Sequence, residues 1–277
     1  MTTKCVSILQ LFMNLTDTHS HLDYFQKRGM LDSIVANAKA EGVNRIINVS
    51  ASPDDWNNYE KISKQHVGFI DWAIGIHPSD IDENSDLALD ALASYFIGPN
   101  APVAIGEIGL DYHFLPKDKL QAEEIITRQK EIFRRQIRLA IDLNAPICVH
   151  ARDSVDDTIK IMTEEDFDFS RAVFHCFAGN LEQIKHLNSR GGRASFTGII
   201  TYPNAEEMRQ CMLTQGLETV MFETDCPYLA PVPMRKNVNE PAFVAHTIDF
   251  AAKLFDISKE ELGEISTKNA YEFFNLK

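Results

Sequence analysis

Two kinds of segment alternate along the chain. Eight short runs rich in apolar and β-branched residues lie between longer segments in which apolar residues recur every three to four positions. The short runs predict strands buried on both faces, and the longer segments predict helices with one apolar face. The predicted strands cover residues 14–19, 45–50, 68–76, 103–106, 145–150, 172–175, 194–197 and 219–224.

The predicted helices cover about 26–41, 54–65, 85–96, 121–143, 153–164, 180–190, 204–215, 241–254 and 258–275. Eight strands that alternate with helices predict an α/β fold, a single parallel (β/α)8 TIM barrel. An open doubly wound sheet is the alternative, but it favours a glycine-rich turn after its first strand. Here the first strand runs into His19-Ser-His21, so the barrel is the better interpretation.

Length and composition favour one domain. A chain of 277 residues suits one such barrel, and no repeat or flexible linker divides it. We expect residues 1–12 to be an N-terminal extension and residues 13–277 to be the barrel domain. The apolar stretch at 8–13 is too short to span a bilayer and lacks the marks of a secretion signal. We therefore expect a cytoplasmic protein without a membrane partner, and a monomer.

Net charge limits the ways in which this protein can bind nucleic acid, and cysteine content indicates its redox compartment. A formal net charge of −13 argues against nucleic-acid binding through a broad basic surface. It does not argue against phosphodiester chemistry, because bound divalent cations dominate the electrostatics of a cleft. The five cysteines are odd in number and contain no Cys-x-x-Cys pair, which fits a reducing compartment.

Metal-ligand side chains stand at the ends of five predicted strands. A barrel brings all strand ends to one face, so residues far apart in sequence are expected to converge there. Imidazole and carboxylate ligands together suit divalent cations, and we predict two of them, Mg²⁺, Mn²⁺ or Zn²⁺. The predicted ligands are His19, His21, Glu107, His150, His175 and Asp225.

Each predicted ligand has an expected role. His19 and His21 lie two residues apart on a strand, so they face the same way and can share one cation. Glu107 offers two oxygens and is expected to bridge two cations, with His150 and His175 completing the second site. Asp225 is the expected catalytic proton acceptor, beside Glu107. Asp17 and Glu223 are expected one layer deeper, as supporting residues.

Three further residues are candidates for substrate contact. His77 follows the third predicted strand, and Arg235 lies in a proline-rich segment after the eighth. Arg152 follows His150 closely, and it either pairs with a substrate phosphate or bridges Asp153 or another helix acid. Asp111, soon after Glu107, is interpreted as a structural hydrogen-bond acceptor.

These motifs resemble the TatD family of metal-dependent hydrolases within the amidohydrolase superfamily, from about residue 13 to the C-terminus. The resemblance implies a (β/α)8 barrel with two divalent cations, held by the same six residues. It also implies deoxyribonuclease activity, with 3′–5′ exonuclease action on single-stranded DNA ends. The matching stretches are DTHSHLD (17–23), GIHP (75–78), IGEIGLDY (105–112), RQKEIFRRQIRLA (128–140), VHARD (149–153), FHCFAG (174–179), SFTGIIT (195–201) and ETDCPYLAP (223–231).

One loop departs from the family pattern, at residues 235–241. Many relatives read Arg-Gly-Lys-Arg-Asn-Glu-Pro there, and Arg235 and the Asn-Glu-Pro at 239–241 match. Lys236 takes the glycine position, and Val238 takes a basic position. The alternative function is an amide, ester or lactone hydrolase on the same dinuclear barrel. Several such subgroups bridge their metals with a carboxylated lysine, whereas the fourth strand here offers Glu107.

Overall fold

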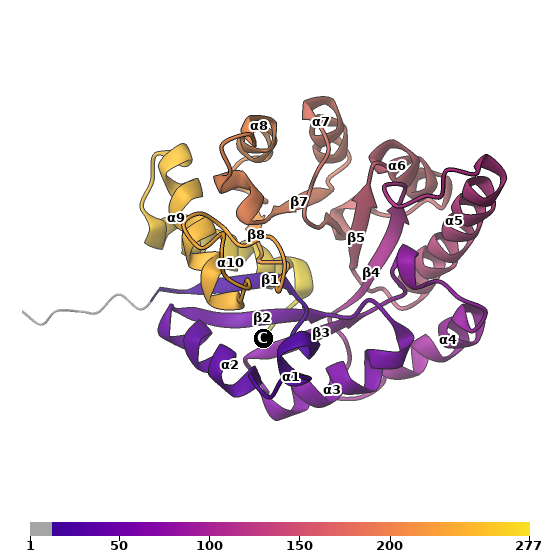
Figure 1. Ribbon diagram of the computed structural model, residues 1–277, viewed down its shortest axis with the longest axis horizontal. Helices are drawn as coiled ribbons and strands as arrows, with labels where there is room; N and C mark the ends of the chain where they lie inside the picture. The colour runs from indigo at the N-terminus through magenta and orange to yellow at the C-terminus, as the bar shows by residue number, and fades with distance from the viewer. Residues whose placement is uncertain (1–12) are drawn as a thin grey trace, which may run out of the picture.

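The computed structural model describes residues 13–277, so the predicted extension 1–12 lies outside the described residues. Eight parallel strands follow one another in a single order around a nearly closed barrel, and helices surround them (Figure 1). The predicted (β/α)8 TIM barrel is confirmed. The strands are β1 (Leu15–Ser20), β2 (Val43–Val49), β3 (Ile70–Ile74), β4 (Ala104–Asp111), β5 (Ile147–Arg152), β6 (Ala172–Phe174), β7 (Arg193–Phe196) and β8 (Met221–Phe222).

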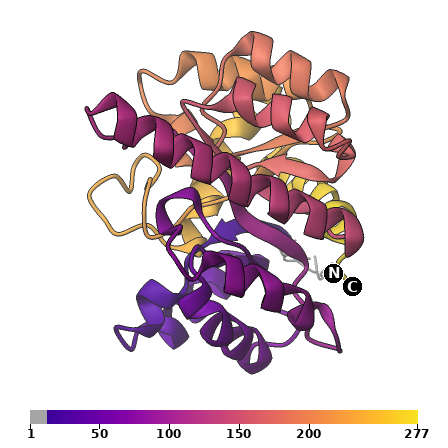
Figure 2. The same ribbon diagram turned by 90° about the vertical axis from the view of Figure 1, so that its right-hand side faces the viewer.

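The helices match the predicted ones except at their ends. The predicted helix 26–41 is two helices, because the chain turns at Gly29, which has a positive φ of 68°. The longest helix, α5, crosses the outside of the barrel in Figure 2. The helices are α1 (Asp23–Gln26), α2 (Leu31–Ala40), α3 (Trp56–Gln65), α4 (Ser85–Leu92), α5 (Lys119–Asp142), α6 (Val155–Glu164), α7 (Leu181–Ser189), α8 (Glu206–Gln215), α9 (Val244–Phe255) and α10 (Lys259–Phe274).

The barrel closes between its first and last strands through a few specific contacts. β8 is only two residues long, and Ser20 and Cys226 form an isolated parallel bridge beyond it. The Asp225 N–H donates to the His19 carbonyl at 2.9 Å, and the His21 N–H donates to the Cys226 carbonyl at 2.9 Å. The closing contacts therefore run through the segments that carry His19, His21 and Asp225.

The two ends of the barrel differ in character. α10 covers the end where the strands start, because Thr267 donates to the Asn14 carbonyl and Asn269 donates to the carbonyls of Leu217 and Val220. Phe273 and its neighbours on this helix pack with apolar residues from six strands. The opposite end is surrounded by the loops that follow the strands, from residue 21 after β1 to residues 223–240 after β8. We call this end the mouth.

β4 is longer than the sequence predicts, since it continues past Gly106 to Asp111. Gly109 permits this by letting β4 approach β5 closely. A Cβ atom at Gly109 would lie 1.9 Å from the His150 carbonyl oxygen, and the residue has a φ of 146°. Because side chains two residues apart share a face, the continued strand places Glu107 and Asp111 on the same side.

We expect Gly109→Ala to prevent normal packing of β4 against β5. The new methyl group has no space, so the free energy of unfolding should fall by more than about 4 kcal/mol. Gly29→Ala is the matched control, because its φ is also positive but nothing lies within 4 Å of its added Cβ. That control should lose only about 1–2 kcal/mol from backbone strain. Urea unfolding of both variants tests this, and equal losses would contradict the packing explanation.

None of the helices in residues 13–277 is long and apolar enough to cross a membrane.

Candidate metal centre

Five of the six predicted ligands come together at the mouth with three further residues, and the sixth, Asp225, lies next to them. Ligand atoms of several histidines and acids lie within 4.8 Å of one another in overlapping groups of three. We call the members of these groups the metal-site cluster: His19, His21, His77, Glu107, Asp111, His150, His175 and Glu223. Asp225 lies beside the cluster, with its Oδ1 3.3 Å from Nε2 of His21.

Glu107 is the centre of the cluster, and its two oxygens face different histidines. Oε2 lies 3.4 Å from Nε2 of His19 and 3.7 Å from Nε2 of His21. Oε1 lies 2.7 Å from Nε2 of His175 and 2.8 Å from Nδ1 of His150. The predicted bridge and its two histidine pairs therefore have matching places in the structure. Burial opposes ionisation of Glu107, but the adjacent imidazoles hold its pKa well below its usual value.

Buried ring nitrogens indicate that the cluster is suited to cations. Both ring nitrogens of His19 and Nδ1 of His175 are buried and have no hydrogen-bond partner in the described chain. A buried polar atom without a partner costs free energy, which a bound cation would recover through these nitrogens. The donor set of imidazoles and carboxylates also fits divalent transition metals.

His77 and Asp111 belong to the cluster, whereas the sequence interpretation made one a substrate contact and the other a structural hydrogen-bond acceptor. Nε2 of His77 lies 3.5 Å from Oε1 of Glu107, and the Ser79 N–H orients the ring by donating to Nδ1. Asp111 Oδ2 lies 3.1 Å from Nε2 of His150, while its Oδ1 accepts the backbone N–H of His113. The signal for Asp111 was present in its spacing, four residues after Glu107, once β4 is known to continue.

Glu223 and Asp17, the two expected supporting residues, are both fully buried. Glu223 accepts the Cys176 N–H at 2.6 Å, and its Oε1 lies 3.5 Å from Nδ1 of His175, within ion-pair distance but without a hydrogen bond. Asp17 is fully buried below His19 and accepts the side-chain and backbone donors of Thr224. Burial raises the pKa of Asp17 to about 7, despite these hydrogen bonds.

Asp225 has a constrained backbone. Its φ of 53° is in the left-handed region, which is uncommon for a residue other than glycine. The closing hydrogen bond to His19 holds this conformation. Burial opposes ionisation of the side chain, but hydrogen bonding to His21 and its charge lower the pKa of Asp225 below the usual value. The carboxylate is thus ionised and ready to accept a proton.

Arg152 is the last residue of β5 and Arg235 lies in the loop after β8, both at the mouth and outside the metal-site cluster. The Arg152 guanidinium lies 4.9 Å from the ring centroid of Phe114, and that of Arg235 lies 3.7 Å from the ring of Tyr202. Arg152 forms no ion pair with any acid among the described residues, and Asp153 instead pairs with His113 at 3.0 Å. The bridge from Arg152 to Asp153, one of the two alternatives, is therefore wrong.

The altered loop is anchored at the positions that match the family. The buried Asn239 side chain donates to the carbonyls of Thr224 and Tyr228, and its Oδ1 accepts the Glu240 N–H. Lys236 and Val238, which depart from the pattern, are exposed. The anchored residues hold the loop to the barrel, whereas the altered ones face solvent.

We expect Asn239→Ala to weaken the fold, because two buried carbonyls and one N–H lose their partner. The free energy of unfolding should fall by about 2–3 kcal/mol. Asn237→Ala is the matched control, since this residue is exposed in the same loop and its side chain makes no hydrogen bond with the part of the chain that the structure describes. Urea unfolding with a chelator present keeps metal binding out of the comparison. Equal stability of the two variants would show that Asn239 is not an anchor.

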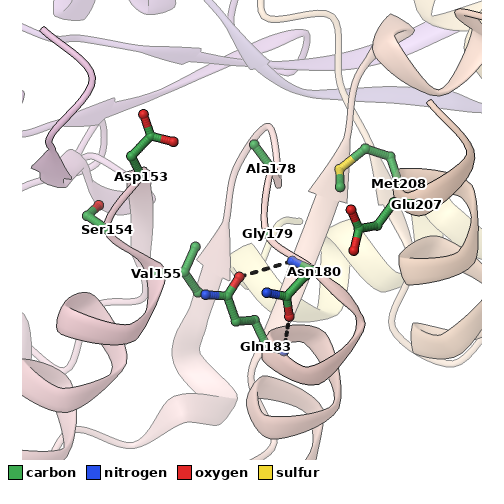
Figure 3. A pocket seen from close by; sticks show the side chains of 9 residues that line it. All are labelled: Asp153, Ser154, Val155, Ala178, Gly179, Asn180, Gln183, Glu207 and Met208. Carbon is green, nitrogen blue, oxygen red and sulfur yellow. Dashed lines mark hydrogen bonds between the residues drawn. The ribbon is translucent and has the colours of Figure 1, made fainter. Parts of the chain in front are cut away.

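A hollow of about 370 Å³ lies at one side of the mouth (Figure 3). It is formed by the segments after β5 and β6 and the start of α8. Asn180 and Gln183 cap α7 reciprocally within it, and Asp153 and Glu207 contribute carboxylates. Its lining contains no lysine or arginine, so it lacks the charge that a phosphate site needs.

Comparisons with known proteins agree with this architecture. Residues 16–275 match the family model described as TatD related DNase. The uncharacterized metal-dependent hydrolase YabD of Bacillus subtilis (strain 168) is 36% identical over 265 residues, covering 95% of this chain and 99% of YabD. The uncharacterized metal-dependent hydrolase YcfH of Escherichia coli (strain K12) is 32% identical over 268 residues, covering 95% of this chain and 97% of YcfH.

Solved structures show the same fold. The crystal structure of YjjV, a TatD homolog from Escherichia coli K12, superposes with a TM-score of 0.86 at 25% identity, covering 95% of this chain and 98% of YjjV. The phosphotriesterase homology protein of Escherichia coli shares the fold at a TM-score of 0.68 and 14% identity, covering 95% of this chain and 99% of that protein. The near full-length family match and the relatives above 30% identity lead to one conclusion. The chain belongs to the TatD family of metal-dependent hydrolases.

Proposed function

We propose that this protein is a metal-dependent phosphodiesterase that acts on DNA, as a 3′–5′ exodeoxyribonuclease. The observation that carries the proposal is the position of Glu107, whose two oxygens face two separate histidine pairs. Such a site suits two divalent cations, which would activate a water molecule and neutralise charge on the scissile phosphate. The family description as a DNase and the divalent site together favour a phosphodiester substrate.

The residues have separable roles in this proposal. His19 and His21 would hold one cation and His150 and His175 the other, with Glu107 between them. Glu223 would keep the His175 ring in its orientation. His77 and Asp111 lie against the second pair, and either would complete its coordination or contact substrate there.

Asp225 would move the proton. Its lowered pKa keeps it ionised near neutral pH, so it can accept a proton from the attacking water. The same carboxyl group can then return the proton to the leaving oxygen of the nucleotide. Arg152 at the end of β5 and Arg235 in the loop after β8 stand at the mouth, where guanidinium groups suit phosphates of the bound strand.

Digestion of oligonucleotides labelled at the 3′ or the 5′ end tests the proposal. Single- and double-stranded substrates are compared with Mg²⁺, Mn²⁺ or Zn²⁺ added, and with a chelator. The expected result is metal-dependent release of mononucleotides from the 3′ end of single strands. An identically purified Asp225→Asn preparation controls for contaminating nuclease. Turnover of esters, amides or lactones without any cleavage of DNA would instead support the alternative hydrolase function.

A further inference from the structure

Two aromatic rings are exposed at the mouth, and neither has a role in the chemistry described above. Among the large apolar side chains exposed in residues 13–277, only Phe114 and Tyr228 are aromatic, at 72% and 63% exposure. Both lie on loops that follow barrel strands, Phe114 after β4 and Tyr228 after β8. Exposed aromatic surface is costly in water, so its restriction to the mouth points to a binding role.

The two rings stand on opposite sides of the mouth. The strands follow one another in order around an eight-stranded ring, so β4 and β8 are four positions apart. Phe114 comes three residues after Asp111, and Tyr228 comes three residues after Asp225. The metal-site cluster therefore lies between the two loops that carry these rings.

The backbone at each ring is held in place. The Tyr228 N–H donates to the Asp225 carbonyl at 3.1 Å, and the Tyr228 carbonyl accepts the side chain of buried Asn239. Next to Phe114, the backbone N–H of His113 donates to Asp111 at 2.8 Å. The His113 ring also packs edge-on against Phe114, with 4.8 Å between centroids. A ring on an ordered backbone loses little entropy when a flat ligand stacks on it.

One arginine contacts the first ring, and a second arginine lies in the same loop as the other ring. The Arg152 guanidinium lies over Phe114, and Arg235 lies in the same loop as Tyr228. An aromatic face for a base, with a cation nearby for the adjoining phosphate, is the combination by which proteins bind single-stranded nucleic acid. A paired base in a duplex does not present its face in this way.

We propose that Phe114 and Tyr228 are base-stacking platforms for single-stranded DNA, one on each side of the scissile phosphate. This inference rests on the proposed nuclease function and specifies how its substrate is held. A strand stacked on both rings would cross the mouth, and the phosphate between the two bases would lie over the metal-site cluster. The preference for unpaired ends follows, because only unpaired bases can stack on both rings.

The test compares Phe114→Ala and Tyr228→Ala with Ile97→Ala. Ile97 is 82% exposed but precedes β4, so it lies at the end of the barrel opposite the mouth. Binding of a fluorescent single-stranded oligodeoxynucleotide is measured by anisotropy with a chelator present, so that cleavage does not interfere. Each mouth variant should bind roughly 5- to 100-fold more weakly, and Ile97→Ala should bind like the wild type. Tyr228→Phe, which keeps the ring, should also bind like the wild type.

An oligonucleotide with abasic residues at its 3′ end distinguishes a loss of base stacking from other causes of weaker binding. The wild type should bind it more weakly than the intact strand, and the alanine substitutions should cause no further loss. Far-UV circular dichroism and the urea unfolding midpoint should be unchanged in both mouth variants, which shows that they are folded. Wild-type affinity of both variants for the intact strand, or an equal loss on the abasic strand, would overturn the inference. Failure of the wild type to cleave any oligonucleotide would refute the nuclease function instead, because the binding comparison needs no cleavage.

Discussion

Glu107→Gln is expected to lose bound metal and to lower kcat/KM for phosphodiester hydrolysis by at least about 10³-fold. Glutamine keeps the shape of the side chain but removes its charge and one of the two equivalent oxygens. In the structure these oxygens face the His19–His21 pair and the His150–His175 pair, so neither pair would keep its shared carboxylate. The histidines alone would hold cations weakly, since they cannot offset the added charge.

Metal analysis by mass spectrometry and steady-state kinetics measure the two parts of this prediction. Glu165→Gln is the matched control, because its carboxylate is also largely buried but pairs with Arg134 and Arg138, away from the mouth. The control should keep wild-type metal content and turnover. Full metal content and activity in Glu107→Gln would show that the Glu107 carboxylate is not needed to hold the cations.

Asp225→Asn is expected to lower kcat by about 10²- to 10⁴-fold, the usual contribution of a general base. Asp225 lies outside the groups that form the metal-site cluster, and its carboxylate contacts Nε2 of His21 at 3.3 Å. Most of the bound metal should therefore remain, and KM should change little. Asparagine has similar size and can keep the hydrogen bond, but it cannot accept a proton.

The same two measurements, metal content and kcat, separate this role from a purely structural one. Asp23→Asn is the control, because Asp23 also follows β1 into the mouth but accepts from Tyr59 and Lys27. It is expected to keep wild-type turnover. Loss of metal in parallel with kcat in Asp225→Asn would assign Asp225 to metal binding rather than to proton transfer.

The sequence predicts the fold well, because each strand is a separate apolar run that can be identified without knowing its tertiary contacts. The pair His19 and His21 was predictable for the same reason, since alternation along one strand decides which way both point. The convergence of Glu107 with His150 and His175 needed one more step, the rule that barrel strands end at a common face.

The rest depends on contacts between distant segments. The continuation of β4 to Asp111 relies on the space that Gly109 leaves for β5, which a single segment does not reveal. The aromatic partner of Arg152 lies in the loop after β4, so sequence proximity suggested an acid bridge where a ring is present. The sequence also predicts a longer eighth strand than the structure has. Beyond the short β8, the Ser20–Cys226 bridge joins the chain to β1 in place of a regular ladder.

The contacts that close the barrel between its first and last strands also determine when, during synthesis, the site can form. The hydrogen bonds between Asp17 and Thr224 join residues 207 positions apart. Contacts of such long separation form late, because the loop entropy must be lost before they contribute. His19 and His21 are synthesised early, yet they meet Asp225 only after the eighth strand has been made. An unfinished chain therefore carries most of the ligands without a working hydrolytic site, and hydrolysis begins only with a complete barrel.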